Sequence, residues 1–370
     1  MRKTIVISAV NLVEAGTLAI LRDCLSFLSQ NAVEQNLRVV AIVHKRSLAD
    51  FPNIEYIEDQ WPKKRWINRL WYEYISLKSI SKEIGHVTLW FSLHDTSPSV
   101  YADRRAVYCH NSFSFYKWSV RDLLFAPKIA MFAIFTKFIY QTNIHKNNFL
   151  VVQQEWFRKG LSSMFSIDKH KIIVYPPLVE RTINSLDTTE RNNARYQFIF
   201  AGSPNSHKNF EIICKAVEIL LNKKIVDFQV VLTLKGTENK YARWIYENWG
   251  HLANIKFLGF VTRQQLEDLY RESQCLIFPS KVESWGLPIS EFKQYDKPML
   301  LADLPYTHET AAGAQHTAYF NPEDANQLAT LMKALIEKDS SCLKPSPKID
   351  YYEPTVENWR QLFDKLMNAN

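Results

Sequence analysis

The 370-residue sequence predicts an α/β protein with two doubly wound, Rossmann-like domains, each built on a parallel sheet. Short, wholly apolar runs predict buried strands, and helical patterns lie between several of them. Strands buried on both faces and alternating with helices are typical of a parallel sheet covered by helices on each side. The alternation restarts near residue 196, and the length suits about two domains at ~100–200 residues each. We therefore expect two domains that face a cleft, where the carboxyl ends of their strands bind ligands.

The first domain is predicted from its apolar runs. Thr4–Val10, with the sequence TIVISAV, has the composition of a buried strand. The leucines from Leu18 to Leu28 recur at spacings of three and four, which predicts an amphipathic helix. Further predicted strands are Leu37–Val43, Val87–Phe91, Ala106–Cys109 and Phe149–Gln153.

The second domain repeats this pattern. Its predicted strands are Tyr196–Ala201, Phe228–Leu234, Ile255–Leu258, Cys275–Pro279 and Pro298–Ala302. Its predicted helices are Asn209–Leu221, a helix that begins at Thr262, Gly286–Tyr295 and Asp324–Glu337. Thr262 and Gln265 have the spacing of a capping box, which marks the start of the second of these helices.

Proline and polar residues set the domain boundaries. Tyr175-Pro176-Pro177 and the polar stretch 185–195 predict the link between the domains. The expected domains are residues 1–180 and residues 190–350. Residues 351–370 contain a last helix, and the sequence leaves open whether it crosses back to the first domain.

The two halves of the chain differ in charge. The net charge is +7, but residues 1–180 carry 23 basic and 15 acidic side chains, whereas the rest carries 22 and 23. This asymmetry predicts that the N-terminal half meets an anionic partner, although a merely soluble basic face has the same pattern. The five cysteines lie far apart, which is typical of a reducing compartment and not of a disulfide scaffold or a zinc site. No apolar stretch approaches the ~20 residues of a membrane-spanning helix.

The segment Phe278–Glu291 has the pattern of an anion-binding strand-to-helix turn. Gly286 permits close approach of a ligand to the backbone, and Pro288 suits the first helical turn, whose free N–H groups bind anions. Glu291, one turn later, points back toward this end and has the two oxygens that a ribose diol needs. Glu283 precedes the helix and faces the other end of the ligand. Surface glutamates near a helix start are the alternative explanation.

A second loop, Phe200–Asn209, follows the first strand of the second domain. Small residues, including Gly202, at the carboxyl end of a strand form a typical phosphate-binding context, and Lys208 supplies a positive charge for a diphosphate. The alternative for Lys208 is a solvated lysine at a helix start. Neither G-x-G-x-x-G nor G-x-x-x-x-G-K-[ST] occurs in the sequence.

Five segments in order, FAGSPNSHKNFE, IKFLGFV, FPSKVESWGLPISEF, ADLPYTHET and AYFNPED, resemble the donor half of a family 4 glycosyltransferase with the GT-B fold. The resemblance covers residues 196–337 and is to enzymes of bacterial O-antigen and capsule synthesis. It implies a retaining, metal-independent hexosyl transfer from a UDP- or GDP-sugar, with no other cofactor.

The resemblance also implies roles for single residues. Lys208 neutralises the leaving diphosphate, and Glu291 holds the ribose hydroxyls. Glu283 and the backbone at Gly286, Leu287 and Pro288 contact the sugar and phosphates. The main chain of Val261 pairs with the base. The family commonly places an Arg beside its Lys, where this chain has His207.

The first domain contributes two further candidates. His110 ends a predicted strand and resembles the family's cleft histidine, close to the reacting sugar; a hydrogen-bonded structural His is the alternative. Gly16 lies in a loop, 11–17, that resembles the acceptor-side glycine loop near the donor phosphates. The implied catalytic residues are thus His110, Lys208 and Glu283.

Residues 113–140 interleave aromatic and apolar side chains with Lys and Arg. This composition suits a helix in the interface of an anionic membrane, and a buried helix with solvated lysines is the alternative. The resemblance implies a saccharide acceptor on a polyprenyl diphosphate, so we expect a cytoplasmic protein, peripheral on the inner face of the plasma membrane. The rival functions are another GT-B enzyme, such as a nucleotide-sugar epimerase or hydrolase, and a basic nucleic-acid-binding protein. No nucleic-acid-binding motif supports the second rival, so no nucleic-acid partner is expected.

Overall fold

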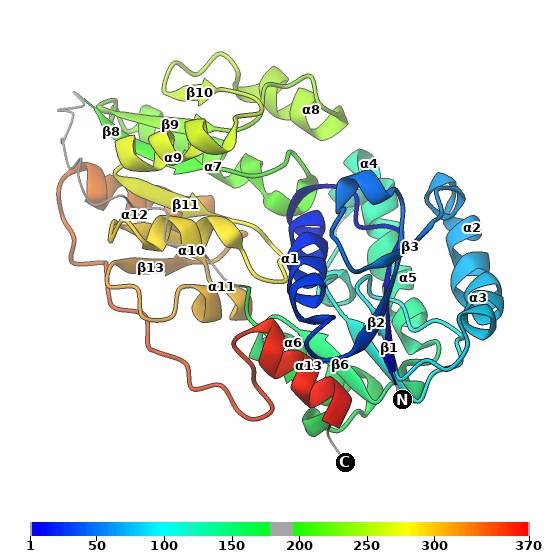
Figure 1. Cartoon of the computed structure of the whole chain (residues 1–370). Coiled ribbons are helices and arrows are strands. Elements are labelled where there is room, and N and C mark those ends of the chain that lie inside the picture. Colours follow the sequence, from blue (N-terminus) through cyan, green and yellow to red (C-terminus); the bar gives the residue numbers. More distant parts are fainter. Residues whose placement is uncertain (1, 119, 178–194, 369–370) are drawn as a thin grey trace. The chain divides into compact units, whose positions relative to one another are not determined.

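The computed structural model describes residues 2–118, 120–177 and 195–368. The chain forms two compact units (Figure 1). Unit 1 contains residues 1–114, 135–178 and 351–370, and unit 2 contains residues 115–134 and 179–350. Most of the predicted link, 185–195, lies outside the described residues.

Unit 1 is built on a seven-stranded sheet with the order β3-β2-β1-β4-β5-β6-β7, in which every pairing is parallel. The strands are β1 (Lys3–Ala9), β2 (Leu37–Val43), β3 (Glu55–Glu58), β4 (Leu89–Ser92), β5 (Arg104–Tyr108), β6 (Phe149–Val152) and β7 (Ile172–Val174). The order reverses between β1 and β4, which is the point where doubly wound sheets bind ligands at the carboxyl ends of their strands.

Alternate residues of β1 pack on opposite faces of this sheet. Ile5 and Ile7 join a core with α1 (Ala15–Asn31) and α13 (Trp359–Asn368). Val6 joins a second core with the π-helix η3 (Tyr72–Ser76) and α3 (Leu77–Ile84), which follow α2 (Trp66–Trp71) in one helical run. This period of two explains why β1 is buried from Thr4 to Ala9, because both of its faces are covered.

The C-terminal segment packs within unit 1. The rings of Phe27 on α1 and Phe363 on α13 stack at 5.7 Å, so the two helices are in contact. Arg158 is fully buried on α6 (Glu155–Phe165), where it donates to the carbonyls of Tyr352 at 2.7 Å and Pro354 at 3.1 Å. The last helix therefore belongs to the first unit, which the sequence left open.

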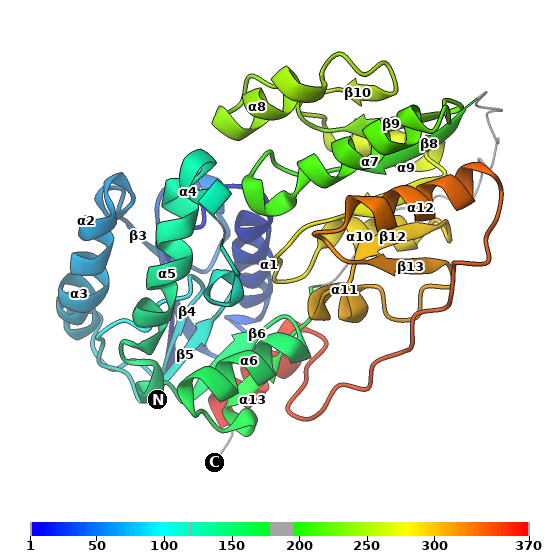
Figure 2. The same ribbon diagram turned by 180° about the vertical axis from the view of Figure 1, so that it is seen from behind.

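Unit 2 has a six-stranded parallel sheet with the order β10-β9-β8-β11-β12-β13, again reversing beside its first strand. The strands are β8 (Tyr196–Phe200), β9 (Phe228–Leu232), β10 (Ile255–Phe257), β11 (Cys275–Phe278), β12 (Met299–Ala302) and β13 (Thr317–Phe320). The helices are α7 (Phe210–Asn222), α8 (Lys240–Trp249), α9 (Arg263–Glu272), α10 (Leu287–Lys293), α11 (Pro305–Thr310) and α12 (Ala325–Ile336). In Figures 1 and 2, α9 and α10 cover one face of this sheet, and α7 and α12 cover the other.

These two sheets confirm the predicted fold class. The capping box at Thr262 is also present, because its side chain accepts from the backbone of Gln265 and the Gln265 side chain accepts in return.

Residues 115–134 fall within the predicted first domain, 1–180, whereas the structure groups them with unit 2. They contain α4 (Val120–Phe125) and the first part of α5 (Pro127–Gln141). The ring of Phe125 lies 4.9 Å from that of Trp244 on α8, and the buried Asp122 accepts from the Ser206 hydroxyl at 2.7 Å. These contacts join residues that are far apart in the sequence, so no local pattern predicts them.

Candidate functional site

Two loops at the carboxyl edge of the unit 2 sheet form the candidate donor site. One runs from β8 through the 3-10 turn η7 (Ser206–Lys208), and the other runs from β11 to α10. The backbone N–H of Lys281 donates to the carbonyl of His207 at 2.8 Å, and the Asn209 side chain donates to Pro279 at 3.3 Å. Because hydrogen bonds join the two loops directly, their side chains act as one site.

Lys208 and Glu283 meet at this junction. The Lys208 ammonium forms an ion pair with Glu283, and their side chains are 16% and 17% exposed. Glu283 also accepts from the Ser280 hydroxyl at 2.7 Å. Burial alone would raise the pKa of Glu283, but Lys208, His207 and the Ser280 hydroxyl outweigh it, so the pKa is lowered. Glu283 is therefore ionised at neutral pH.

His207 stands where the family commonly has Arg, and it does not carry that residue's charge. Burial, followed by the positive charge of Lys208, lowers the pKa of His207 to about 4. A neutral imidazole at this position leaves Lys208 as the cation of the η7 turn at neutral pH.

Glycines bring the backbone of both loops close to the site. A Cβ at Gly202 would meet the ring of Phe200 at 3.3 Å and the Lys208 stem at 3.8 Å. Gly286, which precedes α10, has a φ of +93°, and a Cβ there would meet Ile289 at 3.3 Å. That left-handed conformation favours glycine, which explains why a glycine precedes α10.

Glu291 lies in the second turn of α10 and is held by two partners from α9. One oxygen pairs with Arg263, and the other accepts from the Tyr270 hydroxyl at 3.1 Å. Burial raises the pKa of Tyr270 well above its ordinary value, so the phenol keeps its proton and donates. Each carboxylate oxygen has about two acceptor sites, so each keeps one for a ligand hydroxyl.

The remaining donor-side candidates lie at the ends of the same helices. Leu287 and Pro288 are the first two residues of α10, and Leu287 is exposed. Val261 is half-buried and lies two residues before Arg263, whose guanidinium reaches Glu291. The contact between Arg263 and Glu291 therefore brings the 259–263 loop to α10. This contact is additional to the hydrogen bonds that join the loops after β8 and β11.

His110 and Gly16 belong to unit 1, whereas the donor-side candidates belong to unit 2. The Nε2 atom of His110 lies 3.1 Å from the carbonyl of Leu93, which can only accept, so Nε2 carries the proton. Nδ1 is then an acceptor, and it is buried without a hydrogen-bond partner among the residues that the structure describes. Burial lowers the pKa of His110, which keeps the ring neutral. Gly16 is exposed in the first turn of α1.

The loop after β4 positions His110. Asp95 has a left-handed φ of 68° and accepts from the backbone of His110 at 2.5 Å and of Asn111 at 2.9 Å. The next residue toward β4, His94, forms a buried pair with Glu73, with 2.6 Å between Nε2 and Oε1. No local pattern predicts this pair, because Glu73 lies in a helix 21 positions before His94.

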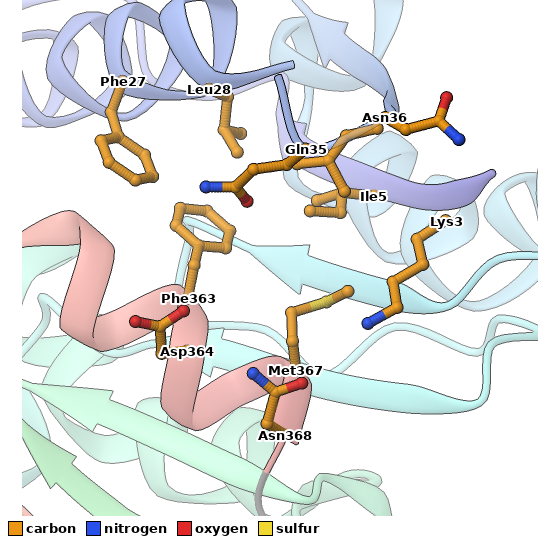
Figure 3. A pocket seen from close by; sticks show the side chains of 11 residues that line it. Lys3, Ile5, Phe27, Leu28, Gln35, Asn36, Phe363, Asp364, Met367 and Asn368 are labelled. Carbon is orange, nitrogen blue, oxygen red and sulfur yellow. The ribbon is translucent and has the colours of Figure 1, made fainter. Parts of the chain in front are cut away.

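A pocket of about 240 Å³ lies elsewhere in unit 1 (Figure 3). Its lining includes Lys3 and Ile5 at the start of β1, Leu37 at the start of β2, and Phe363 on α13. These are the amino ends of the strands, opposite to the edge where sheets of this kind bind ligands. The pocket is therefore not part of the candidate site.

Residues 184–349 match the family described as Glycosyl transferases group 1. The chain is a glycosyltransferase of the GT-B fold. A glycosyltransferase moves a sugar from a donor to a saccharide acceptor, so this enzyme binds both.

The glycosyltransferase is similar along most of its length to a protein of Salmonella typhimurium named O-antigen chain mannosyltransferase RfbU. The two are 21% identical over 270 residues, which is 71% of this chain and 70% of the relative. The glycosyltransferase is also similar to the Serotype-specific mannosyltransferase WbdA of Escherichia coli, with 32% identity over 87 residues. This matched stretch is 23% of this chain and 10% of WbdA.

Solved structures show the same fold as the glycosyltransferase. The lipopolysaccharide outer core galactosyltransferase WaaB has a TM-score of 0.63 at 10% identity, over 92% of this chain and 91% of WaaB. WaaG, a glycosyltransferase involved in lipopolysaccharide biosynthesis, has a TM-score of 0.59 at 12% identity, over 91% of this chain and 93% of WaaG. Among the described residues of the glycosyltransferase, every helix is too short or too polar to cross a bilayer.

Proposed function

We propose that this enzyme transfers a hexose, with retention of anomeric configuration and without a metal ion, from a nucleoside-diphosphate sugar to a lipid-linked saccharide in O-antigen synthesis. The observation that carries the proposal is the junction of Lys208 and Glu283 between two loops at the carboxyl edge of the unit 2 sheet. The names of RfbU and WbdA support mannose as the transferred sugar.

Lys208 would bind the diphosphate and stabilise it as it leaves. Breaking the glycosidic bond leaves negative charge on the diphosphate, and a cation fixed beside it lowers the barrier. In the described structure Lys208 is paired with Glu283. A bound diphosphate would compete for the ammonium, and Glu283 would then be released to accept from hydroxyls of the sugar.

Glu291 would bind the ribose. Its two oxygens are oriented by Arg263 and Tyr270, so the carboxylate is set in place before the nucleotide arrives. This preorganisation reduces the entropy that binding would otherwise lose. Arg263 supplies a second positive charge, beside α10, whereas His207 is neutral.

His110 would accept a hydrogen bond from a hydroxyl of the donor sugar. The support is its protonation pattern, because the Leu93 carbonyl fixes the proton on Nε2 and leaves the Nδ1 lone pair without a protein partner. Gly16 would lie near the donor phosphates, a role that rests on the family resemblance.

A lipid-linked acceptor requires the enzyme to reach a membrane, and residues 113–140 are the proposed contact. Several large apolar side chains of this segment are exposed, among them Trp118, Leu123, Leu124, Met131, Ile134, Phe135 and Phe138. Lys117 and Lys137 are exposed beside them. Exposed rings and aliphatic chains with neighbouring lysines suit the headgroup region of an anionic bilayer on the cytoplasmic side.

The test is incubation of the enzyme with a panel of sugar-labelled UDP- and GDP-sugars, with and without a saccharide acceptor, followed by product analysis. The expected result is acceptor-dependent transfer of one labelled sugar, with the anomeric configuration of the donor, in the presence of EDTA. Release of free sugar in the absence of acceptor would indicate a hydrolase. A changed nucleotide sugar would indicate an epimerase, and an inverted product would exclude the retaining reaction.

A further inference from the structure

The helical run from Trp66 to Ile84 in unit 1 has one buried face and one apolar exposed face. Tyr72 and Leu77 pack into the core beneath the sheet. On the opposite side Ile67 is 70% exposed, Trp71 is 58% exposed and Ile75 is 49% exposed. These three residues are spaced by four positions, so they lie along one stripe of the helix.

The charges around this stripe are mostly positive, although Glu14 lies 3.9 Å from Lys63 and Glu83 is exposed beside Lys82. Between residues 61 and 82 there are six Lys or Arg residues and a single acid, Glu73. Lys63, Lys64 and Arg65 are exposed at one end of the stripe, and Lys78 and Lys82 are exposed at the other. The two lysines at this second end approach the ring of the exposed Tyr101 at 5.8 and 5.1 Å.

The π-helix explains why the single acid does not interrupt the basic surface. Glu73 lies in η3, where it is fully buried and paired with His94. A π-turn is an uncommon distortion that is frequent at functional sites. Here the turn contains both the inward Glu73 and the outward Ile75, so Glu73 adds no negative charge to the exposed face.

We propose that this face, which we call the arm surface (Trp66, Ile67, Trp71 and Ile75 with Lys63, Lys64, Arg65, Lys78 and Lys82), lies on an anionic phospholipid bilayer. Tryptophan and isoleucine enter the headgroup region, and the lysines and arginine contact lipid phosphates. A protein partner fits less well, because lysine is depleted in protein interfaces, whereas long basic side chains extend readily to a lipid surface. This is a membrane contact in unit 1, additional to residues 113–140, and it does not depend on which sugar is transferred.

The test is co-sedimentation of the full-length protein with phosphatidylcholine vesicles that either contain or lack phosphatidylglycerol. One variant removes charge (Lys63→Gln, Lys64→Gln, Arg65→Gln), and another removes the apolar stripe (Ile67→Ser, Trp71→Ser, Ile75→Ser). The matched control, Lys223→Gln, Lys224→Gln, Val226→Ser, changes exposed residues of the same kinds in unit 2. All these positions are exposed, so the fold should persist, and circular dichroism checks it.

We expect the parent and the control to bind the vesicles that contain phosphatidylglycerol. Each basic side chain contributes roughly a fivefold factor at an anionic surface, so the charge variant should bind on the order of 100-fold less at low salt. The apolar variant should bind at least about tenfold less. Quenching of tryptophan fluorescence by brominated phosphatidylglycerol should also be smaller in Trp71→Phe, which keeps an aromatic side chain in the stripe.

Three outcomes would overturn the proposal: no binding of the parent to either vesicle, equal binding of parent and arm variants, or a parent dimer that the apolar variant dissociates. Binding that is lost only when residues 113–140 are changed would also overturn it, while leaving the other membrane contact standing. Sugar transfer to a water-soluble acceptor is measured separately, so failure of the transferase function would be distinguished from failure of this contact.

Discussion

Lys208 and Glu283 lie 75 positions apart in the chain, yet their side chains form an ion pair at the junction of two loops of unit 2. Each comes from a loop that leaves the carboxyl end of a central strand, β8 for the lysine and β11 for the glutamate. The pair places one positive and one negative charge at this junction; we propose that the first binds the leaving diphosphate and the second binds sugar hydroxyls.

The first prediction concerns the ammonium of Lys208. In Lys208→Ala we expect kcat/KM to fall by about 100-fold or more, because the leaving diphosphate loses its stabilising charge. Steady-state assays with the donor sugar measure this. Lys223→Ala, which removes an exposed lysine after α7, is the matched control and should have little effect.

EDTA should leave the activity of the parent enzyme intact. An activity that disappeared with EDTA and returned with Mn²⁺ would contradict metal-free transfer, and it would assign the role of Lys208 to an ion.

The second prediction concerns the ribose contact. Glu291→Ala should weaken nucleotide binding by about 1.5–3 kcal/mol, the range for hydrogen bonds to a charged group. Tyr270→Phe should weaken it less, because it removes only the bond that orients one carboxylate oxygen. Titration calorimetry with UDP and GDP measures both effects.

The double variant separates positioning from binding. If Tyr270 acts through Glu291, Tyr270→Phe should have no further effect on affinity once Glu291 is alanine. Equal losses in both backgrounds would show that Tyr270 does not act through the carboxylate, and unchanged affinity in Glu291→Ala would remove the ribose assignment altogether.

How much the sequence could predict depends on whether a feature is local. β8 and β11 were predicted almost to the residue, since each is a mostly apolar run in the centre of a sheet. β3, with the sequence EYIE, was not predicted, because it is an edge strand with charged ends and half-buried residues. The helical run from Trp66 was also missed, since its tryptophans and tyrosines are typical of strands as well.

The same distinction applies to the site. Glu283, Gly286 and Glu291 belong to one short segment, so their spacing favoured a ligand site, with surface glutamates at a helix start as the alternative until the loop of Lys208 and the family resemblance were added. Arg263 lies 28 positions from the carboxylate that it contacts, and Asp122 lies 84 positions from Ser206. Such contacts depend on how the sheet order brings distant helices together, which no local pattern records. The sequence also could not show that the carbonyl of Leu93 fixes the His110 tautomer.

The third prediction concerns pH and His207. The pKa of His207 is about 4 in the folded chain, against an ordinary value of 6.5. Below pH 6.5 the unfolded chain therefore takes up a proton that the folded chain does not, and acid favours unfolding down to about pH 4. We expect this residue to lower the free energy of unfolding by about 2 kcal/mol between pH 7 and pH 5.

Urea unfolding of the parent and of His207→Gln at these two pH values measures that difference. The variant should lose less stability on acidification than the parent. Parallel losses in the two proteins would show that His207 is protonated in the folded state as easily as in the unfolded chain.

The fourth prediction concerns residues 113–140. Replacing Lys117, Arg121, Lys128 and Lys137 by Gln should reduce binding to anionic vesicles, and added salt should mimic the change by screening. Nucleotide affinity should not change, because Lys208 and Glu291 lie in other segments. If these residues instead form an ordinary buried helix, the parent should not sediment with vesicles, and changing the aromatic residues should destabilise the protein.

The last prediction concerns Asp122, which joins the same segment to the donor loop. Its carboxylate is buried and accepts from the Tyr116 hydroxyl at 3.0 Å and from Ser206, the first residue of the turn that contains Lys208. We infer that Asp122 positions this turn. In Asp122→Asn one charged acceptor is lost, so we expect the KM for the donor to rise about three- to tenfold, the equivalent of one hydrogen bond, with a smaller change in kcat.

A purely structural role would lower stability without this change in KM, so steady-state kinetics and urea unfolding are measured on the same preparation. Asp103→Asn, which alters an exposed carboxylate paired with His86 in unit 1, is the control and should leave both measurements unchanged. Tyr116→Phe removes one donor to the same carboxylate and should raise the KM less than Asp122→Asn. A donor KM equal to that of the parent in Asp122→Asn would show that α4 supports the fold of unit 2 without positioning Lys208.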